Sequence, residues 1–189
     1  MKLFKKLEGD NIYLSPQSPD EEAIEKFTEW LNDFRITDYT GKSAMLITLE
    51  GERKWFEKPK DYAQTFFIVK KEDNKLIGTI GLHEINPINR TATLGIFIGE
   101  KDGRNKGYGT EAIKLILEYS FKYLNLNNIK LDVLEFNPRA IACYKKCGFK
   151  EYGRRRKSEF LYGKYYDRVE MDILAEEFEG DYIKNKNIK

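Results

Sequence analysis

Three short runs of β-branched and aromatic residues follow one another closely in the middle of the chain. They cover residues 64–69, 76–82 and 91–98, and clusters of turn-forming residues connect them. Runs of this length and composition are typical of β-strands, and short connections between consecutive strands permit antiparallel pairing only. The sequence therefore predicts a three-stranded antiparallel meander.

Helices and further strands are predicted on both sides of this meander. Residues 11–14 form a strand candidate, and apolar residues at helical spacing predict helices over 20–31 and 49–57, the second ended by Pro59. The later elements are a long helix after Gly109, a strand over 129–133, a helix from Asn137-Pro138 to Gly148, and strands over 149–162 and 165–174.

This order predicts an α/β (α+β) fold with a mixed central sheet of about seven strands and about four helices. The elements run β-α-α-β-β-β-α-β-α-β-β along the chain. We expect a single domain over residues 1–174 and a polar, frayed tail over 175–189.

Charge and composition exclude several classes of protein. The 33 Lys+Arg and 31 Asp+Glu leave a formal net charge of +2, whereas a nucleic-acid binder needs a strongly basic face. No run approaches the ~18 to 20 apolar residues that cross a bilayer, and no apolar signal-peptide segment follows the basic first residues. Cys143 and Cys147 are four residues apart and His83 is the single histidine, so no four-ligand zinc set exists. We expect a cytoplasmic protein that binds no metal, nucleic acid or membrane.

A glycine-rich segment joins the third strand of the meander to the long helix. Residues 103–110 read Gly-Arg-Asn-Lys-Gly-Tyr-Gly-Thr. Such a loop lets consecutive backbone N–H groups converge on one anion, and the helix that follows adds the positive end of its dipole. Arg104 and Lys106 add side-chain charge. The loop matches neither the P-loop nor the Gly-x-Gly-x-x-Gly fingerprint, and a connector without a ligand is the alternative interpretation.

Two motifs together carry a family resemblance. Residues 104–109 resemble the pyrophosphate signature of the GNAT acetyltransferase superfamily, in which Arg or Gln is followed by two residues, Gly, one residue, and Gly or Ala. Residues 137–149 resemble its second motif, an Asn-initiated helix that carries a tyrosine and ends at Gly-Phe. The order and spacing are those of the family over roughly residues 12–174. The RimJ/RimL branch, which includes bacterial spermidine acetyltransferases, is most similar, through residues 84–86 and 163–167.

The resemblance implies acetyl transfer from acetyl-CoA to an amine in a ternary complex. It places the pantetheine arm beside a third meander strand that splays from the next strand, where Gly99 either permits a bulge or merely ends the strand. Lys146 approaches the outer phosphates or is simply solvated. The implied cofactor-binding residues are Phe97, Ile98, Gly99, Arg104, Asn105, Lys106, Gly107, Tyr108, Gly109, Thr110, Asn137, Ala140, Tyr144 and Lys146.

Tyr144 and Glu84 are the expected catalytic residues. A phenol with a pKa of ~10 can donate a proton to a leaving thiolate with a pKa of ~8.5. Many family members place a glutamate on the third meander strand to take the proton of the amine, but here that position is Thr93. Glu84 is the favoured base, and Glu100 and water are alternatives. Strand alternation places His83 on the opposite face from Glu84 unless the strand is irregular there.

The expected function is N-acetylation of a primary amine on a small molecule or a protein N-terminus. A catalytically silent acetyl-CoA sensor and a polyamine acetyltransferase are the alternatives. A polyamine site requires several acids to converge, and the N-terminal region offers Asp20, Glu21, Glu22, Asp33 and Asp38. The closing strands provide a surface for a homodimer.

Overall fold

The computed structural model describes residues 1–58 and 64–187. One sheet of eight strands runs through the described part of the chain in the order β1-β2-β3-β4-β5-β6-β8-β7. The strands are β1 (Leu7–Glu8), β2 (Ile12–Pro16), β3 (Gln64–Lys70), β4 (Leu76–Asn86), β5 (Thr91–Ile98), β6 (Asn128–Leu134), β7 (Lys150–Leu161) and β8 (Lys164–Leu174). The helices are α1 (Glu21–Leu31), α2 (Phe34–Thr37), α3 (Leu49–Glu57), α4 (Tyr108–Lys122) and α5 (Pro138–Lys146).

The predicted fold class and element order are confirmed. The additional elements are the two-residue β1 and the four-residue α2, which are too short to produce a periodic pattern in the sequence. Helix α3 has the predicted bounds, and Lys58 after it is extended (ψ 134°), as a residue before proline prefers. The predicted stop at Pro59 itself lies outside the described residues.

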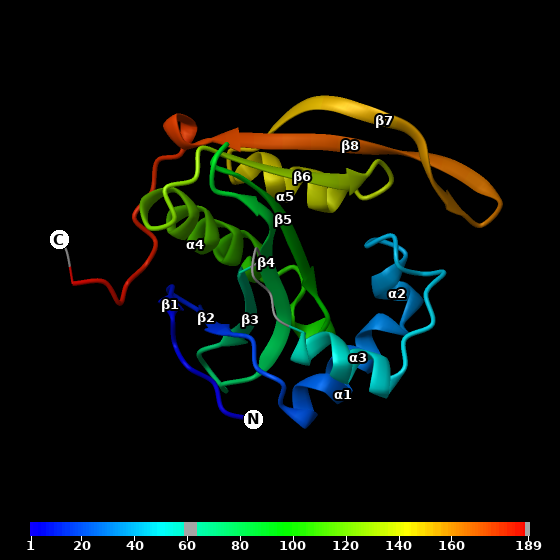
Figure 1. Cartoon of the computed structure of the whole chain (residues 1–189), viewed down its shortest axis with the longest axis horizontal. Helices are drawn as coiled ribbons and strands as arrows, with labels where there is room; N and C mark the ends of the chain where they lie inside the picture. The colour runs from blue at the N-terminus through cyan, green and yellow to red at the C-terminus, as the bar shows by residue number, and fades with distance from the viewer. Residues whose placement is uncertain (59–63, 188–189) are drawn as a thin grey trace.

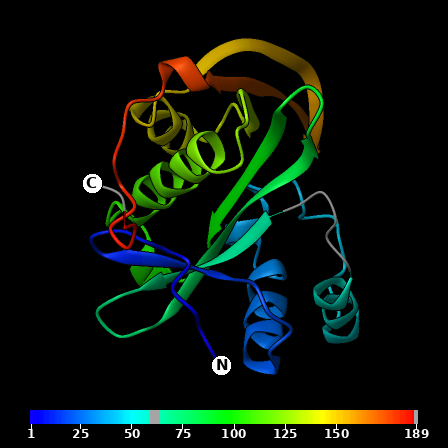
Figure 2. The same cartoon turned by 60° about the vertical axis from the view of Figure 1, so that its left-hand side comes forward.

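Helices cover both faces of the first half of the sheet, because its inner strands are apolar on both faces. In β3, Phe66 and Ile68 pack on the α4 side, whereas Phe67 and Val69 pack against α1 and α3. This follows from the alternation of side chains along a strand. Figures 1 and 2 show α4 on one side of β2–β4, with α1 and α3 on the other. The sheet is thus the middle layer of this half.

The sheet opens between β5 and β6, its only parallel pair among the described strands. These strands pair only at Thr91–Asn128, Ala92–Ile129 and Thr93–Lys130. Beyond this point β5 continues to pair with β4, and β6 continues to pair with β8. The facing edges of β5 and β6 therefore separate, and β6 does not pair with the backbone of residues 94–98.

The closing strands form a long hairpin that reaches over the N-terminal helices (Figure 1). Tyr162 and Gly163 form its two-residue turn, and both have positive φ (50° and 76°), the geometry that matches strand twist in a hairpin. The Tyr162 hydroxyl donates a 2.9 Å hydrogen bond to Asp38 after α2. This contact ties the end of the hairpin to the N-terminal region.

The expectation of a frayed C-terminal tail is wrong for residues 175–187. Ile183 is 4% exposed and belongs to the main apolar core. The buried Glu118 of α4 accepts hydrogen bonds from the backbone N–H of Ile183 (3.0 Å) and from Lys186 Nζ (2.8 Å). The polar sequence gave no sign of these contacts, because the partner of the tail is a buried carboxylate 64 or more residues upstream.

None of the described helices is long and apolar enough to cross a bilayer.

Candidate active site

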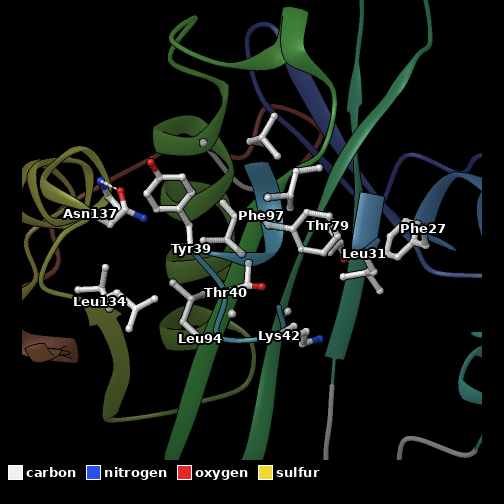
Figure 3. A pocket seen from close by; sticks show the side chains of 18 of the residues that line it. Phe27, Leu31, Tyr39, Thr40, Lys42, Thr79, Leu94, Phe97, Leu134 and Asn137 are labelled. Atoms are coloured by element: carbon white, nitrogen blue, oxygen red, sulfur yellow. Dashed lines mark hydrogen bonds between the residues drawn. The ribbon is translucent and has the colours of Figure 1, made fainter. Parts of the chain in front are cut away.

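A cavity of about 1230 Å³ occupies the opening between β5 and β6. Its walls come from β4, β5, β6, α5 and the start of α4, and its far end is formed by α2, α3 and the loop between them. In Figure 3, Asn137 and Leu134 lie to one side, Phe97, Leu31 and Phe27 to the other, and Tyr39 between them. The splayed strands thus form one end of the cavity and the N-terminal helices form the other.

The glycine-rich loop presents its main chain to the cavity. Asn105 and Gly107 are both left-handed (φ 59° and 85°), and α4 begins at Tyr108. Within the described part of the chain, no acceptor takes the backbone N–H groups of residues 105–110. Side chains added at Gly107 or Gly109 would meet no atom within 4 Å. Six consecutive free N–H groups at a helix N-terminus, with open space in front, form an anion-binding cradle.

The two charged side chains of the loop lie differently, because Arg104 is among the described residues that line the cavity and Lys106 is not. The Arg104 guanidinium donates to the carbonyl oxygens of Ile98 (3.3 Å) and Gly99 (3.1 Å), so it ties the loop to the end of β5. Lys106 is exposed and is absent from the described lining of the cavity. The positive character of the cradle therefore comes mainly from its main chain and from the helix dipole.

Gly99 also differs from the prediction, since it is not among the described residues that line the cavity. A Cβ at this position would lie 2.1 Å from the Trp30 ring. The N–H groups of Gly99 (2.9 Å) and Glu100 (3.2 Å) both donate to the Ile77 carbonyl. Glycine is needed here for the packing of α1, while its neighbours Phe97 and Ile98 do line the cavity, as predicted.

Helix α5 forms the opposite wall. Asn137 caps it by accepting a 3.1 Å hydrogen bond from the Ala140 N–H, and Asn137, Ala140 and Tyr144 all line the cavity. Lys146 does not line it within the described residues, because it is exposed near the end of the helix. The structure thus brings together the cradle, the edge of β5 and one face of α5.

Tyr144 lines the cavity from α5. Its ring packs edge-to-face against Phe149 (5.9 Å between centroids), and no described residue forms a hydrogen bond with its hydroxyl. Burial, reinforced by the charges of Cys143 and Asp132, raises the pKa of Tyr144 above its ordinary value. The hydroxyl consequently keeps its proton at neutral pH.

Cys143 was not predicted to be a site residue, yet it lines the cavity. Its Sγ lies 3.3 Å from Thr110 Oγ1, beside the cradle. A hydrogen bond from Cys147 lowers the pKa of Cys143; burial opposes this shift, while Thr110 and the positive charges of Lys146 and Arg139 assist it. A partly exposed thiol of this kind is more reactive than an ordinary cysteine. The sequence motif contained the residue but gave no sign of its environment.

The expectation that Glu84 faces the cleft is wrong. Strand β4 is bulged between His83 and Asn86, and Glu84 adopts a left-handed conformation (φ 51°). Its side chain is 73% exposed, accepts a 2.9 Å hydrogen bond from Thr93 Oγ1, and is absent from the described lining of the cavity. A bulge re-aims side chains in this way.

Glu100, the alternative acid, is held elsewhere. Lys26 and Lys75 contact its carboxylate at 2.8 and 2.9 Å. Burial opposes ionisation, but the hydrogen bonds and charges of the two lysines outweigh it and lower the pKa of Glu100. Glu100 is also absent from the described cavity lining, so it neither reaches the site nor accepts protons readily.

His83, in contrast, does line the cavity. It pairs with Thr93 across the β4–β5 ladder, and its ring lies over Gly95, where a Cβ would come within 3.2 Å of Nε2. The irregularity that would permit His83 and Glu84 to share one cleft is present in the strand. Only His83 faces the cavity, however.

The far end of the cavity is cationic. Among the described residues, its charged side chains include Arg35, Lys42, Lys54 and Lys58, and Glu52 provides the one carboxylate. The five N-terminal acids do not converge there. None is among the described lining residues, and each has a local partner. These acids are Asp20, Glu21, Glu22, Asp33 and Asp38.

This combination of a splayed mixed sheet with an anion cradle at the edge of the opening defines an enzyme that binds a long phosphorylated carrier. The chain matches the family model for the acetyltransferase (GNAT) domain over residues 12–150. It therefore belongs to the GNAT acetyltransferase family. It is an acetyl-CoA-dependent N-acetyltransferase, and the free amides of the cradle and the unpaired edge of β5 fit this cofactor.

Relatives and solved structures agree. Spermidine N(1)-acetyltransferase of Vibrio cholerae is 35% identical over 139 residues, covering 66% of this chain and 80% of that protein. The probable N-acetyltransferase YjcK of Bacillus subtilis is 30% identical and covers 89% of this chain and 96% of its own. The crystal structure of the Vibrio cholerae spermidine N-acetyltransferase with CoA and spermine superposes with a TM-score of 0.81 at 28% identity, covering 88% of this chain and 97% of that one.

Proposed function

We propose that the chain transfers the acetyl group of acetyl-CoA to a primary amine by direct attack, with both substrates in the one cavity. The observation that carries this proposal is the set of six free N–H groups over residues 105–110. In the proposal these groups bind the diphosphate of CoA. The charge-assisted hydrogen bonds they form with phosphate are of the stronger kind.

The unpaired edge of β5 then receives the pantetheine arm. Residues 94–98 have backbone groups that β6 does not take, and all five line the cavity. The cradle follows the C-terminal end of β5, so an arm anchored there runs back along the strand towards Thr93. Pairing of its amides with the strand edge is the geometry of an added β-strand, and Asn137 and Ala140 close over it from α5.

Tyr144 supplies the proton for the departing sulfur. Its raised pKa keeps the hydroxyl protonated, and the same wall of the cavity carries Asn137 and Ala140. A thiolate is a moderately good leaving group by itself. We therefore expect acid catalysis by Tyr144 to contribute about 10²-fold, the lower end of the usual range.

The acceptor is an amine on a neutral or acidic molecule, such as a protein N-terminus with acidic residues after it. Among the described residues, four cationic side chains and one carboxylate surround the far end of the cavity. Exposed charges of this kind each change affinity by only ~1 kcal/mol or less, but together they disfavour a polycation. Aromatic contacts between Tyr39 and Phe136 and between Phe136 and Tyr166 add an apolar wall.

A polyamine acceptor is the second candidate, favoured by the activity of the Vibrio cholerae relative. The experiment is a thiol-release assay with acetyl-CoA and two acceptors at equal concentration, spermidine and a peptide with a free N-terminus followed by acidic residues. We expect faster release with the peptide, and the preference should weaken as salt screens the charges. Faster release with spermidine would select the second candidate, and silence with both acceptors and with other primary amines would contradict the proposal.

We further propose that copies of the chain associate through β7. This strand is the edge of the sheet, and the hairpin exposes Phe160, Tyr162 and Tyr165. Exposed strand edges and aromatic patches are common places of association, and the Vibrio cholerae spermidine N-acetyltransferase is dodecameric. Light scattering should give a mass at least twice the 22.3 kDa of one chain. A monomer at micromolar concentration would contradict this.

A further inference from the structure

We propose that His83 is the base that takes the proton of the acceptor amine. This inference rests on the proposed acetyl transfer. An alkylammonium with a pKa of ~10.4 is almost fully protonated at pH 7, and only the neutral amine attacks a carbonyl. Some group in the cavity must therefore accept a proton before or during the attack. The β5 residue that pairs with His83 is Thr93, which carries no ionisable group.

His83 lies on β4 and faces the cavity beside β5. His83 and Thr93 are direct partners in the β4–β5 ladder. Partners in an antiparallel pair lie on the same face of the sheet, with their Cβ atoms ~5 Å apart. Thr79 and Gly81, which precede His83 at the same alternation, also line the cavity. The imidazole therefore lies on the same face of the sheet as the Thr93 side chain.

Glycine at position 95 makes room for the ring. A methyl group there would come within 3.2 Å of His83 Nε2 and 3.3 Å of Cδ2, closer than such contacts normally are. Gly95 is part of the unpaired edge of β5 and lines the cavity. The imidazole therefore lies over the stretch of β5 along which the carrier arm runs back from the cradle towards Thr93.

The two carboxylates that the sequence offered as bases do not line the cavity within the described residues. The bulge after His83 points Glu84 outward to Thr93 and towards Lys130 (3.9 Å), and two lysines hold Glu100. Among the described residues that line the cavity, the carboxylates are those of Glu52 and Asp132. Asp132 forms an ion pair with Arg168, so its carboxylate is already engaged.

The chemistry suits an imidazole. An imidazole can accept a proton from an amine directly or through one water. His83 takes one proton from the ammonium, the C–N bond forms, and the C–S bond breaks. Tyr144 gives its hydroxyl proton to the sulfur and is restored by the second proton of the nitrogen. His83 releases its proton to solvent, so that one proton is produced for each acetyl group transferred.

The test compares acceptors that need a base with acceptors that do not. The probes are a peptide that begins with glycine and the same peptide beginning with an aminooxyacetyl group, whose nitrogen is neutral at pH 7. We expect His83→Gln to lower kcat/KM for the glycyl peptide by about 10²-fold, the usual scale for loss of a general base. With the aminooxy peptide the loss should be within about threefold. If spermidine is the better acceptor, it and its mono-aminooxy analogue replace the peptides.

Glu84→Gln is the matched control, because Glu84 is adjacent in sequence and lies outside the described cavity lining. It should leave kcat/KM unchanged with both probes. The affinity for CoA, measured by calorimetry, should be preserved in His83→Gln.

The outcomes separate this inference from the proposed function. Equal loss with both probes, or a loss in Glu84→Gln that His83→Gln does not show, would overturn the role of His83 while leaving acetyl transfer in place. Absence of thiol release by the unaltered enzyme with every acceptor would overturn the proposed transfer and this inference together.

Discussion

The two ends of the cavity are formed by different kinds of groups. The cofactor end uses the main chain: the N–H groups of residues 105–110 and the unpaired edge of residues 94–98. The acceptor end uses side chains from α2, α3 and their connecting loop, among them Arg35, Lys42 and Trp55. The first end is defined by consecutive residues, while the second is assembled from segments that meet only in the folded molecule.

This difference decides what each end can tolerate. A main-chain site depends on glycine and on backbone conformation, so a single added side chain can block it. A side-chain site can change its charge and shape while the backbone stays the same, which allows one fold to serve many acceptors. We therefore expect a substitution at one end to leave binding at the other end unchanged.

The largest effect is expected from Gly109→Asp. A carboxylate at this position would enter the open space in front of the cradle and repel the diphosphate. We expect the Kd for CoA to rise at least 100-fold, about 2.7 kcal/mol. The thermal midpoint without CoA should be unchanged or higher, because an acidic residue in the first turn of a helix is favourable. Calorimetric titration and thermal unfolding measure the two quantities.

Gly153→Asp is the control, since Gly153 is equally open but lies on β7, far along the sheet from the cradle. It should leave the affinity for CoA unchanged. Tight binding of CoA by Gly109→Asp would show that the cradle is not the phosphate site.

The second effect separates binding from chemistry at the cofactor end. Tyr144→Phe should lower kcat by about 10²-fold while the Kd for CoA stays the same, because only the hydroxyl is removed and the ring keeps its contact with Phe149. Thiol release under saturating substrates gives kcat. Tyr123→Phe, on an exposed tyrosine beyond α4, should have no effect. An unchanged kcat in Tyr144→Phe would remove the proton-donor role.

Gly41→Ala tests the acceptor end and, like Gly109→Asp, adds a side chain to a glycine. Gly41 is left-handed (φ 70°), and a Cβ there would lie 2.1 Å from an Arg168 guanidinium nitrogen. The strained backbone should lower the free energy of unfolding by ~1–2 kcal/mol. Displacement of Arg168 should raise the acceptor KM by up to about tenfold. The Kd for CoA should not change, and a parallel loss of CoA affinity would show that the two ends are not separable.

The smallest effect concerns Cys143 and needs no variant. Because its lowered pKa favours the thiolate, iodoacetamide should modify Cys143 in preference to the buried Cys147 at neutral pH. CoA in the cradle covers this thiol, so saturating CoA should slow the reaction several-fold, whereas spermidine or a peptide acceptor should not. Mass spectrometry of the modified chain measures both rates. Protection by the acceptor rather than by CoA would reverse the assignment of the two ends.

The same difference explains how far the sequence alone could predict the molecule. The strands over residues 64–98 and the cap at Asn137 were predictable because alternation and capping are local. The cradle was predictable because glycine is required at Gly107. The directions of the Arg104 and Lys106 side chains were not predictable, because where a long side chain turns depends on neighbours outside the loop.

The bulge after His83 shows most clearly what the sequence alone could not predict. Simple alternation placed His83 and Glu84 on opposite faces but could not say which one faced the cavity, since that depends on the pairing of β4 with β5. The acceptor end was hidden for a similar reason. Its lining comes from helices separated by many residues, and no local pattern in the sequence states that Lys42 and Trp55 share a wall.

The most direct measurement is a crystal structure of the enzyme with CoA bound. The account predicts diphosphate oxygens within 2.7–3.2 Å of several backbone nitrogens of residues 105–110, and the sulfur of CoA between Tyr144 and the strand beside His83. Finding the diphosphate held elsewhere, by lysine side chains with those nitrogens turned to water, would contradict it.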